Sequence, residues 1–192
     1  MHAPSSIETD PDVQDHVILM HEDGTARGLA PRATVHTAST PLHLAFSCHL
    51  VRADGKVLLT RRALSKRTWP GVWTNSFCGH PRQGESMQQA LARHAHHELG
   101  LEIHTVREVL PDFRYRAVDA SGVVENEFCP VFVAETDGEP CPHPGEVAEL
   151  RWVDPEELHA LVELAPWTLS PWSVEQLPAL HGLLRPEHGG SS

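Results

Sequence analysis

The residues of this sequence that could carry out chemistry gather first between positions 69 and 101. Cys78 and His80 lie two residues apart at the end of a strand predicted over 73–80, next to the loop sequence GHPRQGE. Alternation along this strand predicts two faces, one with Thr74, Ser76, Cys78 and His80 and the other with Trp73, Asn75 and Phe77. A thiol beside an imidazole at a glycine-containing loop could transfer a proton or bind a metal ion. A single cysteine, in contrast, is more often a small buried hydrophobe.

The helix that follows this loop has the clearest sequence signals. Ser86 and Gln89 form a capping box and Gly100 supplies a left-handed stop, so the sequence predicts a helix over 87–99. Glu98 falls on the apolar face of this helix, where a carboxylate is costly to bury without a cation or hydrogen-bond donors. Either the helix end frays and hydrates Glu98, or Glu98 binds a Mg²⁺ ion that bridges to phosphate oxygens.

Further imidazoles and carboxylates come from two other segments. His36 and His43 stand seven residues apart, and His43 opens a strand predicted through Val51. In the run VVENEFCPVFVAE (123–135), alternation places Glu125 and Glu127 on one face that is otherwise apolar. Two carboxylates there repel each other and resist desolvation unless they share a cation.

The imidazoles and carboxylates of these segments form a plausible ligand set. Each histidine alone is more often structural, but the combination suits a divalent ion such as Mn²⁺, Fe²⁺ or Zn²⁺. We therefore predict an octahedral site with one open position and five ligands: His36, His43, His80, Glu125 and Glu127. One of the two carboxylates would also be available for proton transfer.

Positive charge is concentrated in the segment 61–67, which contains Arg61, Arg62, Lys66 and Arg67. The whole chain, in contrast, carries a net charge of −11 with histidine neutral. The segment is either a solvated loop or a clamp for an anion, because arginine and lysine suit phosphate oxygens.

Composition limits the class and location of the protein. At 192 residues the chain has the length of one ordinary domain. Its acidity argues against general nucleic-acid binding, and no apolar run approaches the ~18 residues of a membrane helix. The four cysteines show no CxxC pattern and no signal-peptide pattern opens the chain, which predicts reduced thiols in a cytoplasmic protein.

The remaining elements predict an α+β fold, a mixed β-sheet with flanking helices. Strands are also predicted over 16–21, 56–61, 101–109, 112–119 and 151–153, with a loop over 135–149. Helices are predicted from Asp154 to about Glu163 and from Ser170-Pro171 onward. We expect a disordered tail over 1–14, a single domain over 15–185 and a loose tail over 186–192.

The loop and helix partly resemble the Nudix box, G-x5-E-x7-R-E-U-x-E-E-x-G-U. The matching residues are Gly79, Glu85, Arg93, Glu98 and Gly100, whereas His94 and His97 replace two of the glutamates with which Nudix hydrolases hold metal and activate water. From about Asp15 to Leu177 the chain resembles the type I isopentenyl-diphosphate Δ-isomerases, through TRRALSKRTWPGVWTNSFCGHP, PDFRYRA, GVVENEFCPVF and PWTLSPW. This resemblance implies a Nudix-type mixed β-sheet core with additional N- and C-terminal elements.

The resemblance also implies residue roles. Cys78 is similar to the catalytic thiol of these isomerases, Glu127 to the catalytic carboxylate and Tyr115 to the tyrosine that assists it. The five His and Glu residues match a Mn²⁺ (or Zn²⁺) site, and Glu98 with the backbone carbonyl of Cys78 matches a Mg²⁺ site that meets the diphosphate. Trp172 matches the aromatic residue facing the isoprenoid. Arg62 and Lys66 match residues that bind the diphosphate, and Arg32 stands where these isomerases often have lysine. His94 departs from the pattern, because bacterial members tend to have arginine at this position, and a neutral histidine is a weaker partner for the diphosphate.

The activity implied is interconversion of isopentenyl and dimethylallyl diphosphate through a tertiary carbocation. On this basis Cys78 and Glu127 should face each other across the substrate pocket. The small-molecule diphosphate is the expected partner, without nucleic acid or membrane, for a monomer or weak homodimer. The alternatives are a Nudix pyrophosphohydrolase of a nucleoside diphosphate derivative and a non-catalytic metal-binding module. The former leaves the missing glutamates unexplained, and the latter leaves Cys78 and Trp172 without a role.

Overall fold

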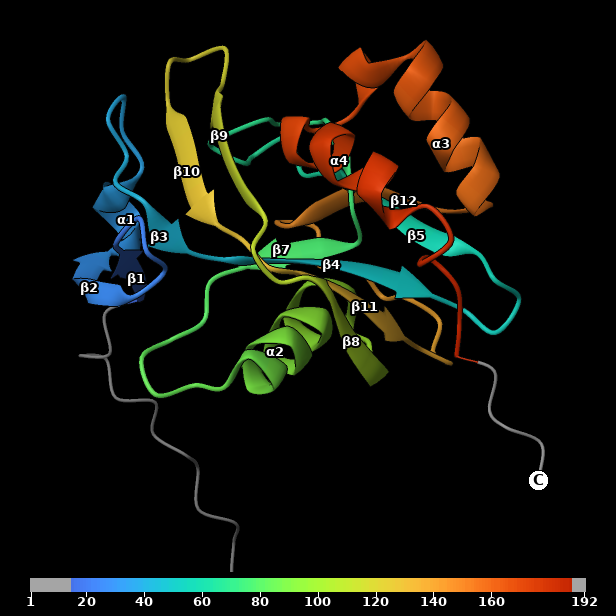
Figure 1. Cartoon of the computed structure of the whole chain (residues 1–192). Helices are drawn as coiled ribbons and strands as arrows, with labels where there is room; N and C mark the ends of the chain where they lie inside the picture. Colours follow the sequence, from blue (N-terminus) through green and yellow to red (C-terminus); the bar gives the residue numbers. More distant parts are fainter. Residues whose placement is uncertain (1–14, 188–192) are drawn as a thin grey trace, which may run out of the picture.

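Two β-sheets and four short or medium α-helices make up the fold of the computed structural model, which describes residues 15–187 (Figure 1). The helices are α1 (Arg32–Val35), α2 (Met87–Leu99), α3 (Pro155–Leu164) and α4 (Pro171–Gln176), with two 3₁₀ turns, η1 (Pro166–Thr168) and η2 (Leu177–Leu180). The strands are β1 (His16–Met20), β2 (Ala26–Pro31), β3 (His43–Leu44), β4 (Phe46–Val51), β5 (Val57–Arg62), β6 (Trp73–Thr74), β7 (Phe77–Gly79), β8 (His104–Leu110), β9 (Arg114–Val118), β10 (Val124–Phe128), β11 (Val131–Glu135) and β12 (Val147–Val153).

The predicted α+β class is confirmed, with two mixed sheets in place of one. The smaller sheet has the order β2-β1-β3-β10-β9, and the larger has the order β12-β5-β4-β11-β8, with β6 paired to β5 and β7 paired to β4. Pairing is antiparallel except between β3 and β10 and between β4 and β11, which run parallel. Both parallel pairs come from the same two stretches of chain, which therefore link the sheets.

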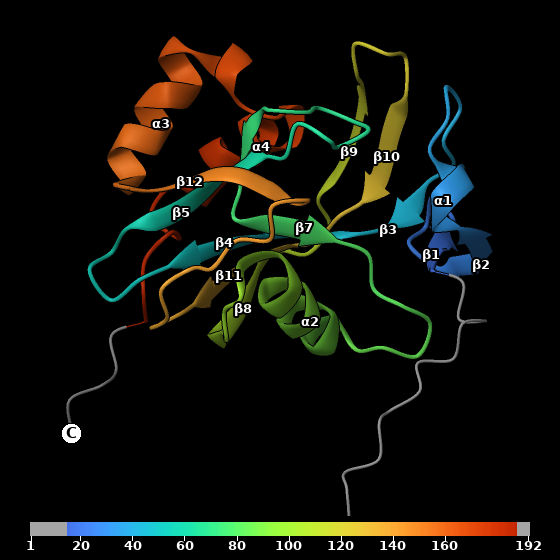
Figure 2. The ribbon, with the colours of Figure 1, turned by 180° about the vertical axis from the view of Figure 1, so that it is seen from behind.

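The larger sheet is covered on both faces. Figures 1 and 2 show α2 on one side of it and α3 and α4 on the other. Alternate residues of its strands point to the two sides: Leu50 and Leu58 pack with Leu91 of α2, whereas Val51 and Val57 pack in the cluster of α3 and η2. The central strand β4 is buried along its whole length, including the polar residues Ser47 and His49.

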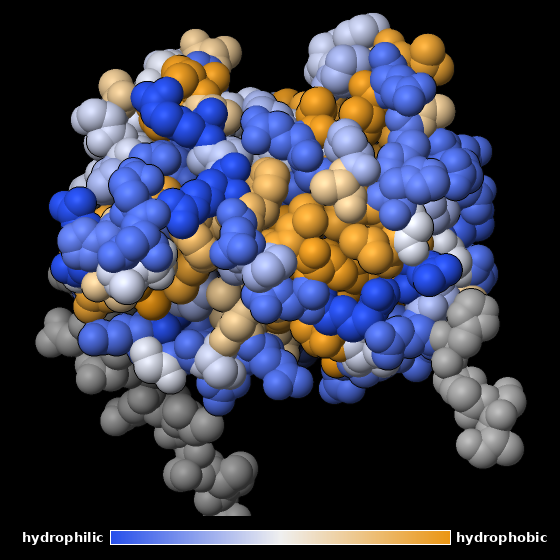
Figure 3. Space-filling model, viewed as in Figure 1, coloured by the Kyte–Doolittle hydropathy of each residue, from blue (hydrophilic) through white to orange (hydrophobic). Residues whose placement is uncertain are grey.

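Apolar residues also gather on one face of the surface. Figure 3 shows them in the middle of the view, around the place where α4 and β4 lie in Figure 1, within a polar surround. Large side chains that are exposed elsewhere include Leu64, Leu164 and Trp167. Within residues 15–187, no helix combines the length and the apolar character that crossing a membrane requires.

The helix predicted over 87–99 is confirmed with both of its caps. The Ser86 side chain accepts from the Gln89 backbone, the Gln89 side chain accepts from the Ser86 backbone, and Gly100 adopts φ 64°. The helix after Asp154 is also confirmed as α3, and the helix after Ser170 as α4. These helices could be predicted because their end signals are local in the sequence.

Three strands that were predicted to be continuous are interrupted in the structure. The stretch 73–80 is interrupted at Asn75 and Ser76, so Asn75 does not lie on the opposite face from Cys78 as alternation suggested. The strand predicted from His43 through Val51 divides at Ala45, and the run 123–135 divides at Cys129 and Pro130. Pro130 has no backbone N–H and cannot continue a sheet ladder, which explains the second division.

Other elements were missed or shortened by sequence analysis. The strand β2 and the one-turn helix α1 were not predicted, and β12 begins at Val147, inside the segment predicted as a loop. The strand β2 has mostly exposed residues and therefore gives no buried-face pattern. The predicted tail 1–14 lies outside the described residues. Of the predicted C-terminal tail, 186–187 are described and irregular, and the Glu187 N–H donates to the Glu135 side chain.

Removal of the α2 N-cap gives a test of the fold. We expect Ser86→Ala to lower the free energy of unfolding by about 1 kcal/mol, because one helix-end N–H loses its acceptor. Thermal unfolding should show a Tm lower by about 2–4 °C. Ser39→Ala, in an exposed turn, is the matched control and should leave Tm unchanged. Equal Tm values for the two variants would contradict the capping role.

Candidate active site

The predicted site residues lie around one cavity of about 690 Å³. Its walls come from both sheets, from α2 and from the first turn of α4. The predicted residues in its lining are Arg32, His36, Arg62, Lys66, Cys78, His80, Glu98, Tyr115, Glu125, Glu127 and Trp172. His43 is not in the lining because it is fully buried behind it.

Strand register explains how the most distant of these residues meet. Glu127 on β10 is the parallel partner of His43 on β3 and the antiparallel partner of Tyr115 on β9. On the larger sheet, Cys78 of β7 is the partner of Ser47 on β4. Since β3 and β4 are nearly continuous, the carboxylate and the thiol are brought to the same junction between the sheets.

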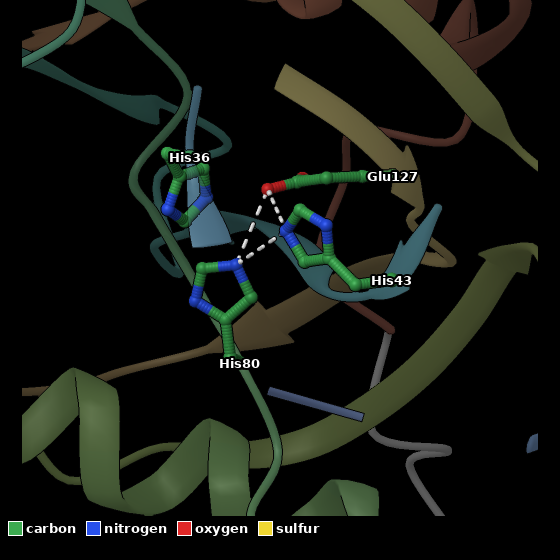
Figure 4. Close-up of side chains that lie close together, drawn as sticks. All are labelled: His36, His43, His80 and Glu127. Carbon is green, nitrogen blue, oxygen red and sulfur yellow. Dashed lines mark hydrogen bonds and ion pairs between the residues drawn. The ribbon is translucent and has the colours of Figure 1, made fainter. Parts of the chain in front are cut away.

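A group of potential metal ligands lies at this junction. One ligand atom from each of His36, His43, His80 and Glu127 lies within 4.8 Å of the others (Figure 4). The Nε2 atoms of His43 and His80 are 3.2 Å apart, and Glu127 Oε1 lies 3.6 and 3.3 Å from them. Side chains from a loop, two strands and a strand end thus present nitrogen and oxygen to one point.

The hydrogen bonding of His43 supports a cation at that point. Its Nδ1 is 2.9 Å from the Pro41 carbonyl oxygen, which can only accept, so Nδ1 carries the proton of the neutral ring. The lone pair of Nε2 is therefore directed toward His80 and Glu127. A lone pair on His43, a second ring nitrogen 3.2 Å away and a carboxylate oxygen fit a divalent metal ion, and the carbonyl fixes the His43 ring as is usual for metal-binding histidines.

Glu125, the fifth predicted ligand, lies at the edge of this group. Its Oε1 accepts a 2.9 Å hydrogen bond from the Thr68 hydroxyl, and its Oε2 is 3.2 Å from His36 Nε2. Oε2 is buried without a hydrogen bond of good geometry. Its place as a ligand stays a prediction, and Thr68 is a contact that sequence analysis did not identify.

The pKa values of the ionisable groups in the cavity are shifted in opposite directions. Burial raises the pKa of the Cys78 thiol to about 12, and burial also raises the pKa of Tyr115 well above its ordinary value. Burial acts in the same direction on Glu127, but in the metal-free protein the facing imidazoles of His43 and His80, when protonated, outweigh it and hold the pKa of this carboxyl group well below the usual range. At neutral pH the cavity therefore holds a protonated thiol and an ionised carboxylate.

Glu98 points from α2 into the cavity, and its partner is His94. The His94 Nδ1 lies 2.8 Å from Glu98 Oε1, and both side chains are largely buried. The His94 ring also packs against Gly79, where an added Cβ would lie 2.3 Å from it. Position 79 therefore requires glycine. His94, which departs from the arginine common in bacterial members, is in place to orient Glu98.

The predicted diphosphate-binding residues already have acceptors within the protein. Arg32 pairs with Asp15 at 2.8 Å, and Lys66 forms an ion pair with Glu146. Arg62 donates to the Thr68 and Trp69 carbonyl oxygens, which holds its guanidinium 5.6 Å from the centre of the Trp172 ring. All three line the cavity and supply it with positive charge, opposed in part by acidic partners.

Aromatic rings line the apolar part of the cavity. The Trp172 ring is 5.4 Å from the ring of Tyr115 and 5.4 Å from that of Trp69. Its indole Nε1 donates to the side-chain oxygen of Asn75 at 2.9 Å. Trp172 is thus fixed in the wall beside Cys78, and Asn75 is a second contact that the alternation pattern concealed.

A buried polar chain lies behind the thiol. Cys78 Sγ is 3.7 Å from the Ser47 hydroxyl, which donates to the Gln176 side-chain oxygen at 3.0 Å. The same oxygen is 3.1 Å from Nε2 of His49. His49 and Gln176 are fully buried, so this arrangement joins β4 to α4 across the back of the site.

The fold and this cavity place the chain in a known class. A model of the NUDIX domain matches residues 41–178. A solved protein of Deinococcus radiodurans superposes with a TM-score of 0.66 at 20% identity, covering 85% of this chain and 98% of that one. The MutT protein of Methanosarcina mazei superposes with a TM-score of 0.57 at 18% identity, over 74% and 95% of the two chains. The chain belongs to the Nudix family.

Sequence relatives define its place within that family. The isopentenyl-diphosphate Delta-isomerase of Clavibacter michiganensis subsp. michiganensis is 58% identical over 176 residues, covering 92% of this chain and 89% of the relative. That of Kocuria rhizophila is 58% identical, over 88% and 96% of the two chains. The chain belongs to the isopentenyl-diphosphate Delta-isomerases, as its motifs predicted, and the residue roles carried over from them stay predictions.

The buried histidine behind the thiol generates a pH prediction. Burial lowers the pKa of His49 from 6.5 to about 4, so between these values the unfolded chain binds a proton that the folded protein does not. Stability therefore falls with decreasing pH through this window, by about 3 kcal/mol. We expect His49→Gln to remove this part of the slope in denaturant unfolding between pH 7 and 4.

The control for this measurement is His96→Gln, which changes an exposed histidine of α2. The difference between the unfolding free energies of wild type and His49→Gln should change with pH, whereas the difference between wild type and the control should not. Parallel curves for all three proteins would contradict the assignment of a buried neutral His49.

Proposed function

We propose that this cavity interconverts isopentenyl and dimethylallyl diphosphate, with Cys78 and Glu127 as the two proton-transfer groups and Tyr115 assisting Glu127. The observation that carries the proposal is the presence of a protonated thiol and an ionised carboxylate in one aromatic cavity. The curated relatives bear the name of this activity.

The proton inventory of the cavity suits the reaction. Moving the double bond requires a new C–H bond at the terminal carbon, formed at the expense of the π bond, and a tertiary cation next to it. A C–H bond on the other side of that cation then breaks, and its electron pair forms the new π bond. The resting site holds one donor, the thiol, and one acceptor, the carboxylate. Because the reaction is reversible, the two groups exchange roles between the two directions.

The cation formed between these steps requires a neutral, electron-rich neighbour. Trp172 is fixed in the cavity wall by its hydrogen bond to Asn75 and by the ring of Tyr115. An indole face can stabilise a cation by about 1–2 kcal/mol. The buried phenol of Tyr115, the register partner of Glu127, can donate a hydrogen bond to that carboxylate.

Metal ions complete the proposal. His36, His43, His80, Glu125 and Glu127 would hold Mn²⁺ or Zn²⁺, and Glu98 with the carbonyl of Cys78 would hold Mg²⁺ together with the substrate diphosphate. When bound, these cations supply positive charge that fixes the carboxylates and neutralises the diphosphate. His94 holds Glu98 in position for this role.

The diphosphate would bind to the basic side chains of the cavity, those of Arg32, Arg62 and Lys66. Entry of the anion would compete with Asp15 for Arg32 and with Glu146 for Lys66. Arg62 keeps its carbonyl partners, because its guanidinium has donors to spare. With the diphosphate bound in this way, the apolar tail of the substrate would lie near Cys78 and Trp172.

We extend the proposal to the setting of the enzyme. The acidic chain would act in the cytoplasm as a monomer or weak homodimer, on a small-molecule diphosphate and without nucleic acid or membrane.

Loss of the thiol tests the chemistry. We expect Cys78→Ala to abolish turnover, because no other group supplies the proton on that side of the substrate. Proton NMR of isopentenyl diphosphate with enzyme and Mg²⁺ in D₂O measures both double-bond migration and deuterium uptake. Cys141→Ala, which alters an exposed free cysteine, is the control and should react like wild type. Turnover by a folded Cys78→Ala protein, or phosphate release by wild type as in a hydrolase, would overturn the proposal.

Metal binding gives an independent test. We expect His80→Ala to weaken Mn²⁺ binding by about tenfold or more, since it removes one converging ligand. Calorimetric titration of the metal-free protein with Mn²⁺ measures this without substrate. His97→Ala, on the exposed side of α2, should bind like wild type. Equal affinities for the two variants would exclude the predicted site.

A further inference from the structure

Asn75, which lies between β6 and β7, makes more hydrogen bonds than its neighbours in the sequence. Asn75 is fully buried and does not line the cavity. Its side-chain Nδ2 donates to the carbonyl oxygens of Cys48 at 3.1 Å and Phe77 at 2.7 Å. Both amide donors are thereby used, which fixes the orientation of the amide and directs Oδ1 to the other side.

The oxygen of this amide meets two side chains of the active site. It accepts from the indole Nε1 of Trp172 at 2.9 Å and from the thiol of Cys78 at 3.2 Å. An indole N–H can only donate, so the assignment of oxygen to this position is unambiguous. The Thr74 hydroxyl is a third donor at 2.8 Å.

The backbone of the same residue holds the helix that carries Trp172. The Asn75 N–H donates to the Ser173 hydroxyl at 3.1 Å, and the N–H of Ser170, which caps α4, donates to the Trp73 carbonyl at 2.8 Å. The bend at 75–76 is thus bonded to the first turn of α4 through backbone and side chain. The thiol on β7 and the indole on α4 are connected through one residue.

We propose that Asn75 is a positioning residue for the isomerisation, whose amide oxygen holds the Cys78 thiol and the Trp172 indole in fixed relation to each other. This inference rests on the proposed function. An amide suits the task because it accepts hydrogen bonds without ionising, so it orients the thiol proton and does not compete for it. None of the basic side chains of the cavity is a hydrogen-bond partner of Asn75, so we expect its loss to affect the chemical step more than diphosphate binding.

Kinetics of Asn75→Ala, compared with Ser76→Ala, test this role. Ser76 is the matched control because it is equally buried at the same bend, yet its hydroxyl bonds only the backbone of Leu58 and Leu50. We expect Asn75→Ala to lower kcat by about 10- to 100-fold with little change in KM, because the reacting groups lose their alignment. Ser76→Ala should lose thermal stability but keep kcat. Wild-type kcat in Asn75→Ala, or an equal loss in the control, would overturn the proposal.

Asn75→Asp provides a second test if the alanine variant does not fold. At low pH the new carboxyl group is neutral and retains an acceptor oxygen, whereas its ionisation places charge beside the thiol and two carbonyls. The ratio of variant to wild-type kcat should therefore fall as pH rises. A purely structural role gives a ratio that does not vary with pH, and that result would overturn the proposal.

Spectroscopy without substrate separates this inference from the proposed function. The indole N–H resonance of Trp172, assigned by its loss in Trp172→Phe, should shift in Cys78→Ala, because the thiol and the indole share one acceptor. The S–H stretching band of Cys78, isolated by an infrared difference with Cys78→Ala, should move in Trp172→Phe. Both measurements leave Asn75 in place, and the absence of both shifts would overturn its proposed positioning role. Lack of turnover by the wild-type protein would instead count against the isomerase function.

Discussion

The site depends on two stretches of chain that run parallel to each other and pass together from one sheet to the other. The chain through β3 and β4 runs beside the chain through β10 and β11, and both divide at the same level, at Ala45 and at Cys129-Pro130. The N-terminal halves belong to the smaller sheet and the C-terminal halves to the larger. Where they part, side chains from both sheets can face one cavity.

Ionisable groups are also buried at this junction. A buried group stays charged only if it has partners of opposite charge or hydrogen-bond donors, and otherwise it is neutral. Glu127 has a pKa held low by two imidazoles, and Cys78 has no such partner and keeps its proton. Two groups with opposite tendencies thus coexist in one cavity, which is a common arrangement for acid and base catalysis. The ordinary pKa values of 9.0 for a thiol and 4.5 for a carboxyl group already differ in this direction, and the neighbours that the fold supplies widen the difference.

The Nudix helix has a different role here from its role in the hydrolases that the box resembles. Of the glutamates in the motif, Glu85 is bound to Arg93 at 2.7 Å, and Glu98 reaches the cavity. His94, in the place of a third, bonds Glu98 and packs on Gly79. The helix therefore presents a single carboxylate to the cavity.

The sequence by itself determined the fold class, the family, the α2 helix with both caps, and most residues around the cavity. Helix caps are local, and a family motif retains the chemistry of a site in its residue types. Only the tertiary structure decided that Asn75 shares the side of Cys78 and that Thr68 bonds Glu125. Alternation assumes an unbroken strand, but the strand bends at 75–76, where the Asn75 N–H donates to Ser173, about a hundred positions further along the chain. Contacts of that kind arise when separate segments pack together, and no local pattern encodes them.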